Sequence, residues 1–268
     1  MIILLPMAGA GSRFVNAGYK EHKPVIPTTY LQTGEKLPMV VCAVKDLPDS
    51  DKSKVIFIGR DFHKTDNVDK EILSYFPNSM FIELNYLTEG QASTCLIAEE
   101  YINNSQELLI AGCDNGMVYN YDKFIQAKQD ADVLVFTYRN DESVLINPSA
   151  YGWCKIDDKN NITEVSVKKQ ISDNPAYDHA VVATFWFKKG EYFVSASKKM
   201  IAEDDRVNNE FYVDQVINHC IDLGLKAKVF EIDRYLGWGT PVDYERYEHI
   251  IKYWHDFQQK DIFIKGIL

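Results

Sequence analysis

Short, unbroken apolar runs alternate with longer amphipathic stretches over the first 140 residues of the chain. The apolar runs have the length of strands and contain few polar side chains, which is typical of a parallel sheet covered by helices on both faces. We therefore predict strands at residues 2–7, 54–59, 80–84, 107–112 and 132–138. The stretches between them predict helices at residues 39–46, 65–76, 91–103 and 122–129.

The pattern changes after residue 140, where three strand-like runs lie close together before helical spacing returns. We expect strands at 153–156, 162–167, 180–187 and 226–232, and helices at 190–200, 211–223 and 242–257. Without a repeat or a low-complexity linker, this order predicts one α/β domain over residues 1–268 with three layers, α/β/α, around a mixed, mainly parallel sheet. Its parts would be two halves, about 1–140 and about 141–250, and a C-terminal tail at 251–268. The apolar run 261–268 suits either packing on a neighbouring subunit, as in a homo-oligomer, or a strand on the chain itself.

Composition excludes several classes of protein. With 46% hydrophobic residues among 268, the chain is an ordinary globular one. Its net charge of −10 argues against nucleic acid or an anionic membrane as the main partner. Five widely spaced cysteines without a C-x-x-C pair indicate reduced thiols, and the apolar N-terminus has no basic region before it, so we expect a cytoplasmic protein.

The segment Leu-Pro-Met-Ala-Gly-Ala-Gly-Ser-Arg at residues 5–13 follows the first predicted strand. Its glycines, Gly9 and Gly11, let backbone amides approach phosphate oxygens closely, and Arg13 and Lys23 supply positive charge. Residues 1–36 hold four basic and two acidic residues, a local excess of positive charge. A Rossmann loop would have a third glycine where Phe14 stands, and a Walker loop would have a G-K-[ST] that is absent. A tight turn with solvated cations is the plainer alternative.

Together with the segments after it in the chain, this loop resembles the start of the sugar-phosphate nucleotidyltransferase family, whose members open with a strand, G-x-G-[ST]-R and a later P-K-P. The matching residues are Gly9, Gly11, Ser12, Arg13, Lys23 and Pro24, and His22 stands in place of the first proline. Further segments agree in order: 88–92, 112–115, 168–175, 209–213 and 239–241. The resemblance covers about residues 1–250 and implies a Rossmann-like nucleotidyltransferase fold, with a nucleotide-binding first half and an acceptor-binding second half.

The resemblance also implies a set of site residues. Arg13 and Lys23 would be catalytic. The nucleotide would be bound by Met7, Ala8, Gly9, Gly11, Ser12, Arg13, Lys23, Glu89, Gly90, Gln91 and Asp114. The acceptor would be bound by Asn115, Lys168, Lys169 and Glu210.

Asp114 is the expected ligand of Mg²⁺. It follows a predicted parallel strand, where ligands bind in open α/β sheets, and its carboxylate suits a hard cation. An Asx turn is the alternative for this residue. Relatives often place a second metal carboxylate just before G-T-P, where this chain has Gly237. The second ligand therefore stays open among Asp243, Asp178 and Glu210. Glu210 would otherwise contact acceptor hydroxyls or simply begin a helix.

Two choices remain in the second half. Lys168 and Lys169 are adjacent, so in a strand they point to opposite faces. The position that best fits the family's phosphate-binding lysine is Lys169, and a solvated pair at the sheet edge is the alternative. Tyr151, Trp153, Tyr177 and Trp186 either line the acceptor side or fill the core, and we expect most of them in the core.

The reaction implied is the transfer of a nucleotidyl group from an NTP, with CTP or UTP favoured, to a sugar 1-phosphate or another small phosphorylated acceptor. Pyrophosphate would be released, and the product would supply surface or capsule polysaccharide synthesis. A glycosyltransferase of the related nucleotide-sugar (GT-A) fold and a non-catalytic nucleotide-binding module are the alternatives. The loss of a carboxylate at Gly237 favours the module, whereas Arg13 and Lys23 argue against it.

Overall fold

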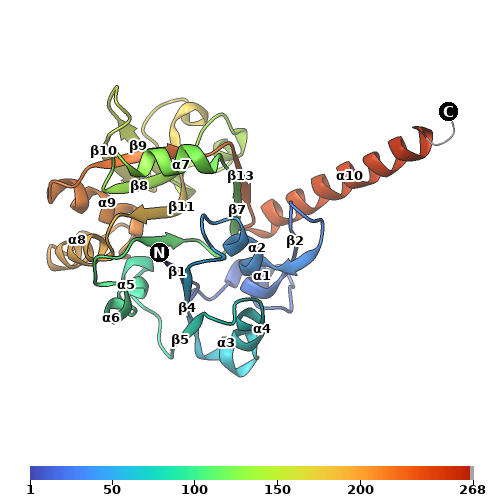
Figure 1. Ribbon diagram of the computed structural model, residues 1–268, viewed down its shortest axis with the longest axis horizontal. Coiled ribbons are helices and arrows are strands. Elements are labelled where there is room, and N and C mark those ends of the chain that lie inside the picture. Colours follow the sequence, from blue (N-terminus) through green and yellow to red (C-terminus); the bar gives the residue numbers. More distant parts are fainter. Residues whose placement is uncertain (266–268) are drawn as a thin grey trace.

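The computed structural model describes the backbone of residues 1–265 and the side chains of residues 1–257. Its centre is a nine-stranded sheet to which both predicted halves contribute strands (Figure 1). The strands are β1 (Ile2–Pro6), β4 (Lys54–Arg60), β5 (Met80–Leu84), β6 (Leu108–Ala111), β8 (Val133–Tyr138), β9 (Gly152–Ile156), β10 (Ile162–Val167), β11 (His179–Phe187) and β12 (Ala227–Glu231). They run in the order β10-β9-β11-β6-β1-β4-β5, and β8 pairs with β11 and β12.

The pairing of these strands confirms the predicted mixed α/β sheet. Strands β6, β1, β4 and β5 are parallel neighbours, as their continuous apolar sequences predict, and β8 and β12 are parallel too. The change in pattern after residue 140 corresponds to antiparallel pairing, because β11 runs against β6, β8 and β9, and β9 runs against β10. The register of β11 shifts between Val181 and Phe185, where Ala183 has a positive φ of 60°.

Helices cover both faces of the sheet. Successive side chains of a strand point to opposite faces, so Ile2 and Leu4 belong to one buried cluster while Ile3 and Leu5 belong to the other. The first cluster includes side chains of α5 (Gln91–Leu96), α6 (Glu99–Ile102), α8 (Gly190–Ala202) and α9 (Val213–Asp222). The second includes side chains of α2 (Met39–Lys45), α4 (Val68–Tyr75) and α7 (Tyr121–Lys128).

Two predicted helices are each divided in the structure. The helix predicted at 65–76 is α3 (Asp61–Thr65) followed by α4, with Asn67 at a left-handed φ of 60° between them. Asparagine tolerates this conformation better than most residues, so the chain turns there while the apolar spacing continues. The helix predicted at 91–103 divides into α5 and α6 around Ala98.

A third buried cluster joins the beginning of the chain to its end, and the sequence did not predict it. It combines Phe14, Ile26 and Met39 with Trp238 and Tyr244, among others. Its residues come mainly from α1 (Ser12–Asn16), α2, β13 (Arg234–Gly237) and α10 (Pro241–Lys265), and β3 (Lys36–Pro38) packs against it through Leu37. The short elements η1 (Lys23–Val25), β2 (Pro27–Thr29) and β7 (Asn115–Val118) complete the fold here. Strand β2 pairs with β3, and β7 pairs with β13, in two small antiparallel sheets.

Helix α10 begins on this third cluster and then projects away from the body (Figure 1). The hydroxyl of Tyr244 donates to the carbonyl of Pro27 at 2.7 Å, and that of Tyr247 donates to the carbonyl of Thr29 at 2.6 Å. The helix continues to Lys265, so the predicted strand at 261–268 is wrong as far as that residue; residues 266–268 lie outside the described residues. Within residues 1–265, no helix is both long and apolar enough to cross a membrane.

Candidate active site

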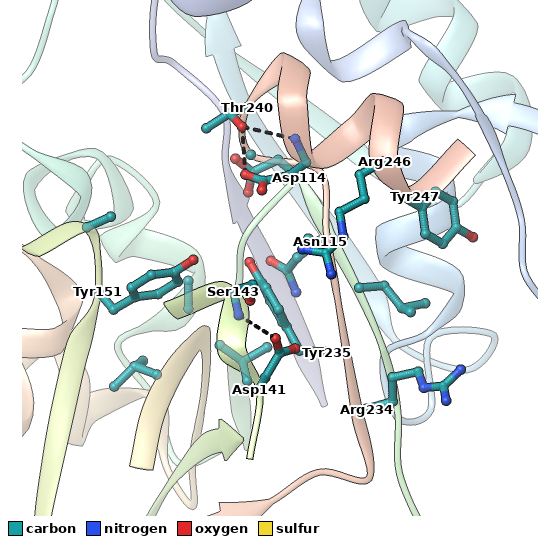
Figure 2. A pocket seen from close by; sticks show the side chains of 18 of the residues that line it. Asp114, Asn115, Asp141, Ser143, Tyr151, Arg234, Tyr235, Thr240, Arg246 and Tyr247 are labelled. Carbon is teal, nitrogen blue, oxygen red and sulfur yellow. Dashed lines mark hydrogen bonds between the residues drawn. The ribbon is translucent and has the colours of Figure 1, made fainter. Parts of the chain in front are cut away.

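A cavity of about 620 Å³ opens beyond the ends of β1 and β6. Of the predicted site residues, five line it together, although they come from segments far apart in the sequence: Arg13, Gln91, Asp114, Asn115 and Lys168. Asp243 also lines it. Figure 2 shows the part of the wall formed around Asp114, Tyr151 and Tyr235.

The glycine-rich loop follows β1. Its Arg13 lines the cavity, whereas Met7, Ala8, Gly9, Gly11 and Ser12 do not. The amide of Met7 donates to the carbonyl of Ile58 at 2.8 Å, and Met7 and Ala8 are buried. The loop then becomes exposed at Gly9, and Gly11 adopts a left-handed φ of 63° before α1 begins. Among the described residues, nothing accepts a backbone hydrogen bond from the amides of Gly9 or Gly11. These amides are therefore accessible to an anion.

Lys23 and Asp114 form the central charged pair of the site. The Nζ atom of Lys23 donates to Oδ2 of Asp114 at 2.5 Å and to the carbonyl of Gly239 at 3.1 Å. Burial opposes the charge on Lys23, but the carboxylate of Asp114 outweighs it and raises the pKa of the lysine. Burial likewise opposes the charge on Asp114, yet Lys23 holds the pKa of this carboxyl below its usual value. Both groups are therefore charged at neutral pH.

Arg13 is an exposed side chain that lines the cavity on the same side. Its positive charge opposes the protonation of Lys23 and Lys168 and favours the ionised carboxylate of Asp114, as shown by its contributions to their pKa values. The fields of Lys23 and Arg13 thus overlap at the Asp114 carboxylate, and that of Arg13 also reaches Lys168. An anionic ligand would be attracted to this end of the cavity.

Gln91 lines the cavity, whereas its neighbour Glu89 does not. Gly90 has a φ of 128°, and a Cβ atom added to it would lie 2.5 Å from the amide nitrogen of Phe211. Backbone hydrogen bonds lie next to this close contact: the amide of Ala92 donates to the carbonyl of Phe211, and the amide of Phe211 donates to the carbonyl of Glu89. The side chain of Glu89 accepts from Arg206 at 3.0 Å outside the cavity.

Of the two adjacent lysines, the structure places Lys168 on the cavity wall and leaves Lys169 exposed. Strand β10 ends at Val167, and Lys168 has a left-handed φ of 60°, so the alternation of a strand no longer applies there. The Nζ atom of Lys168 donates to the carbonyl of Ala150 and lies 5.4 Å from the ring centre of Tyr212. Burial lowers the pKa of Lys168, and the carboxylate of Asp214 opposes that change.

The three candidates for a second metal ligand lie in different places. Asp243 lines the cavity and accepts from the hydroxyl of Thr240 at 2.6 Å. Asp178 accepts from Ser172 at 2.7 Å and is not part of the cavity wall. Glu210 is exposed and is not part of the wall either.

Gly237 is the position where the family resemblance led us to expect a second metal carboxylate, and the structure shows what surrounds it. A Cβ atom added at Gly237 would lie 2.9 Å from Cε1 of Tyr235. The ring of Tyr235 thus takes part of the space that a longer side chain would need. Asn115, directly opposite Gly237 in the β7–β13 pair, is buried and faces the cavity.

Several residues of the wall were not predicted from the sequence. They are Asp141, Ser143, Asp214, Arg234, Tyr235 and Arg246. Of the aromatic residues considered, Tyr151 lines the cavity, Trp153 and Trp186 are buried in the core, and Tyr177 is exposed. Asp141 follows the end of β8 and precedes a short 3₁₀ helix, so its position beyond a parallel strand was the one available signal.

The strand–loop architecture, with its ligand groups beyond the ends of parallel strands, defines a Rossmann-like nucleotide-binding protein. A family model described as nucleotidyl transferase matches residues 2–265. The chain therefore belongs to the nucleotidyltransferase family. No protein among the curated ones matches the sequence.

Solved structures agree on the fold. The chain resembles a nucleoside-diphosphate-sugar pyrophosphorylase from Vibrio cholerae, with a TM-score of 0.74 and 19% identity over 92% of this chain and 99% of that one. It also resembles an inositol-1-phosphate CTP transferase from T. maritima, with a TM-score of 0.68 and 14% identity over 92% and 93% of the two chains. HddC from Yersinia pseudotuberculosis is a further match, with a TM-score of 0.61 and 16% identity over 91% and 96%.

Proposed function

We propose that this nucleotidyltransferase transfers the nucleotidyl group of an NTP to a small phosphorylated acceptor and releases pyrophosphate. The observation that carries the proposal is the Lys23–Asp114 pair, at 2.5 Å, whose carboxylate lines the same cavity as Arg13. The two cations suit the negative charge of a polyphosphate, and the Asp114 carboxylate suits a metal ion bound to it. Lys168 offers a separate cation for a second phosphate. The protein then acts by positioning reactants and stabilising charge.

In the reaction, an oxygen of the acceptor's phosphate attacks the α-phosphorus of the NTP in line. A new phosphorus–oxygen bond forms as the bond from the α-phosphorus to the bridging oxygen of the β-phosphate breaks, and the electron pair leaves with pyrophosphate. Arg13 and the exposed loop amides bind the leaving pyrophosphate. Lys23 neutralises charge at the α-phosphate, and Lys168 holds the acceptor's phosphate.

Mg²⁺ is part of the proposal. Asp114 and Asp243 both line the cavity and both offer carboxylate oxygens, the ligand type that Mg²⁺ prefers. Among the described side chains, no group of three or more acidic, histidine or cysteine residues lies together as a metal cluster. The donor set therefore fits an ion that takes its other ligands from phosphates and water. When bound, Mg²⁺ neutralises negative charge on the phosphates.

The finer assignments also belong to the proposal. We propose CTP or UTP as the nucleotide, with Gln91 as the side chain that contacts the base, because Gln91 lines the cavity at the start of α5. We place the protein in the cytoplasm, as a supplier of activated precursors for surface polysaccharide synthesis. Loss of a surface polymer on deletion of the gene would support that role, and an unchanged cell surface would contradict it.

A pyrophosphate-release screen tests the reaction directly. Each of four NTPs is incubated with Mg²⁺ and a panel of phosphorylated sugars, polyols and amines, and the products are separated. The proposal requires pyrophosphate together with a nucleoside diphosphate-linked product. Transfer of a sugar from a nucleotide sugar with release of free nucleoside diphosphate would identify a glycosyltransferase. Tight binding of Mg–NTP without any product would identify a non-catalytic module.

A further inference from the structure

The acceptor side of the cavity contains a slot between two tyrosine rings. Figure 2 shows the hydroxyl end of Tyr151 pointing toward the ring of Tyr235, with Asp141 and Ser143 beside them. Tyr151 comes from the segment before β9 and Tyr235 from β13, so the slot exists only when these distant segments pack together. Burial, and then the charge of the Asp114 carboxylate, raise the pKa of Tyr235. Tyr235 therefore lies near Asp114, and the slot is next to the proposed reaction centre.

The rings are held in place from behind. Tyr138 stacks on Tyr235 with ring centres 4.5 Å apart and planes at 8°, and it lies edge-on to Tyr151 at 6.4 Å. Trp153, which is fully buried, packs against Tyr151 at 6.0 Å. The hydroxyl of Tyr138 is buried and has no hydrogen-bond partner among the described residues. Tyr138 and Trp153 therefore hold the rings of Tyr235 and Tyr151 in place from outside the cavity.

The charged group of the slot is a carboxylate without a counter-ion. An oxygen of Asp141 accepts a hydrogen bond from the amide of Ser143 at 2.9 Å, which fixes its position. Among the side chains that the structure describes, none forms an ion pair with Asp141. Burial, followed by the field of the Asp114 carboxylate, raises the pKa of Tyr235, so this phenol adds no charge of its own to the slot. Lys168 flanks Tyr151, since its Nζ atom donates to the carbonyl of Ala150 and its amide donates to the carbonyl of Tyr151. Arg246 lies beside Asn115, and Arg234 points away from the tyrosines (Figure 2).

A neutral ligand in the slot would cover the Asp141 carboxylate without neutralising it, which is unfavourable. A cation would instead be attracted both by the carboxylate and by the electron-rich faces of the tyrosines, and quaternary and other ammonium groups are bound in this way. Resting on the function proposed above, we propose that the acceptor is the phosphate ester of an amino alcohol. Its ammonium group lies between Tyr151 and Tyr235 against Asp141, and its phosphate lies toward Lys168 and Asp114.

The test compares two acceptors that differ only in charge. Choline phosphate is assayed for pyrophosphate release beside its carbon isostere, in which a tert-butyl group replaces the trimethylammonium group. The wild-type enzyme is expected to have a kcat/KM about 10- to 100-fold higher for choline phosphate. Ethanolamine phosphate, glycerol phosphate and glucose 1-phosphate complete the panel, and the two amines should exceed the two neutral acceptors.

The variant Asp141→Asn keeps the shape of the side chain and its acceptor oxygen while removing the charge. It should lose most of the preference for choline phosphate over the isostere, because it no longer attracts the ammonium group and no longer disfavours the neutral tert-butyl group. The exposed substitution Tyr177→Phe serves as a control for Tyr235→Leu, which should raise the KM for both amines. A melting curve for each variant separates loss of binding from loss of folding.

The outcomes distinguish this inference from the function on which it rests. Equal rates for choline phosphate and its isostere, or higher rates with a sugar or polyol phosphate, would overturn the ammonium slot and leave the nucleotidyltransferase reaction intact. Absence of pyrophosphate with every acceptor would instead contradict the proposed reaction. In that case, calorimetry with choline phosphate alone still tests the slot. If choline phosphate did not bind the wild-type protein, the ammonium slot would be overturned.

Discussion

The two sides of the cavity recognise charge with different means. On the side that we assign to the nucleotide, Arg13 and Lys23 come from one glycine-rich segment, and Lys23 is already paired with Asp114. On the acceptor side, Asp141, Tyr151 and Lys168 come from three separate segments, and Asp141 has no ionic partner among the described side chains. A short local motif can thus bind phosphate, whereas binding of the smaller acceptor needs side chains from distant parts of the chain.

The largest expected effect belongs to the nucleotide side. Lys23→Ala should lower kcat by about 10²–10³, since it removes a charge that stabilises the transition state. Lys20→Ala, an exposed lysine of the same loop, is the matched control and should be close to wild type. Steady-state pyrophosphate release measures both. Near-normal turnover of Lys23→Ala would remove the basis for assigning the nucleotide to this side.

The second prediction concerns a carboxylate that serves the fold. Asp46 is buried and accepts from the amide of Met117 at 3.1 Å, and burial raises its pKa to about 6. The unfolded chain loses this proton near pH 4 and the folded protein near pH 6, so Asp46 makes the protein less stable as the pH rises through that window.

Asp46→Asn lacks this titration. Denaturant unfolding at pH 4 and pH 6 should therefore show the variant gaining about 2 kcal/mol relative to wild type between the two values. Its kinetic constants should stay unchanged, in contrast to those of Asp141→Asn. A constant difference in stability across the window would contradict the raised pKa of Asp46.

The third prediction decides between the two adjacent lysines. Lys168→Ala should raise the KM for the acceptor by about 10- to 100-fold, the value of a hydrogen bond to a charged group. The KM for the NTP should change much less. Lys169→Ala is the control one residue away, on an exposed side chain, and should behave as wild type. If Lys169→Ala raised the KM for the acceptor and Lys168→Ala did not, the acceptor's phosphate would have to be placed outside the cavity.

The smallest effect is expected at the candidate for the second metal ligand. Asp243→Asn keeps the hydrogen bond from Thr240 but removes the charge, so it should raise the Mg²⁺ concentration needed for half-maximal activity by several-fold, on the order of the loss of one exposed ligand. Asp178→Asn, outside the cavity, is the control. An unchanged Mg²⁺ requirement in Asp243→Asn would leave Asp114 as the one carboxylate that binds the metal.

The sequence predicted the sheet well because each central strand is a continuous apolar run, and such a run by itself indicates a buried strand. The sequence also predicted the glycine-rich loop and Asp114 beyond β6. Both directly follow strands, and their residue types can be interpreted from the local sequence alone. Lys168 and Tyr235 could not be predicted in the same way. The first depends on a left-handed residue at the end of β10, and the second on the pairing of β13 with β7, more than 100 residues away in sequence.

The third buried cluster sets a condition on when the protein can become active during synthesis. Lys23 donates to Gly239, Tyr19 donates to Glu245 at 2.9 Å, and Phe14 packs on Tyr244. The first loop is thus held in place by residues that lie more than 200 positions later in the sequence. Because a chain folds as it leaves the ribosome from its N-terminus, the parallel strands can form early, but the loop that holds Lys23 is completed only after the beginning of α10 has emerged. Nascent chains that end before this helix would therefore have most of the sheet and no finished catalytic centre.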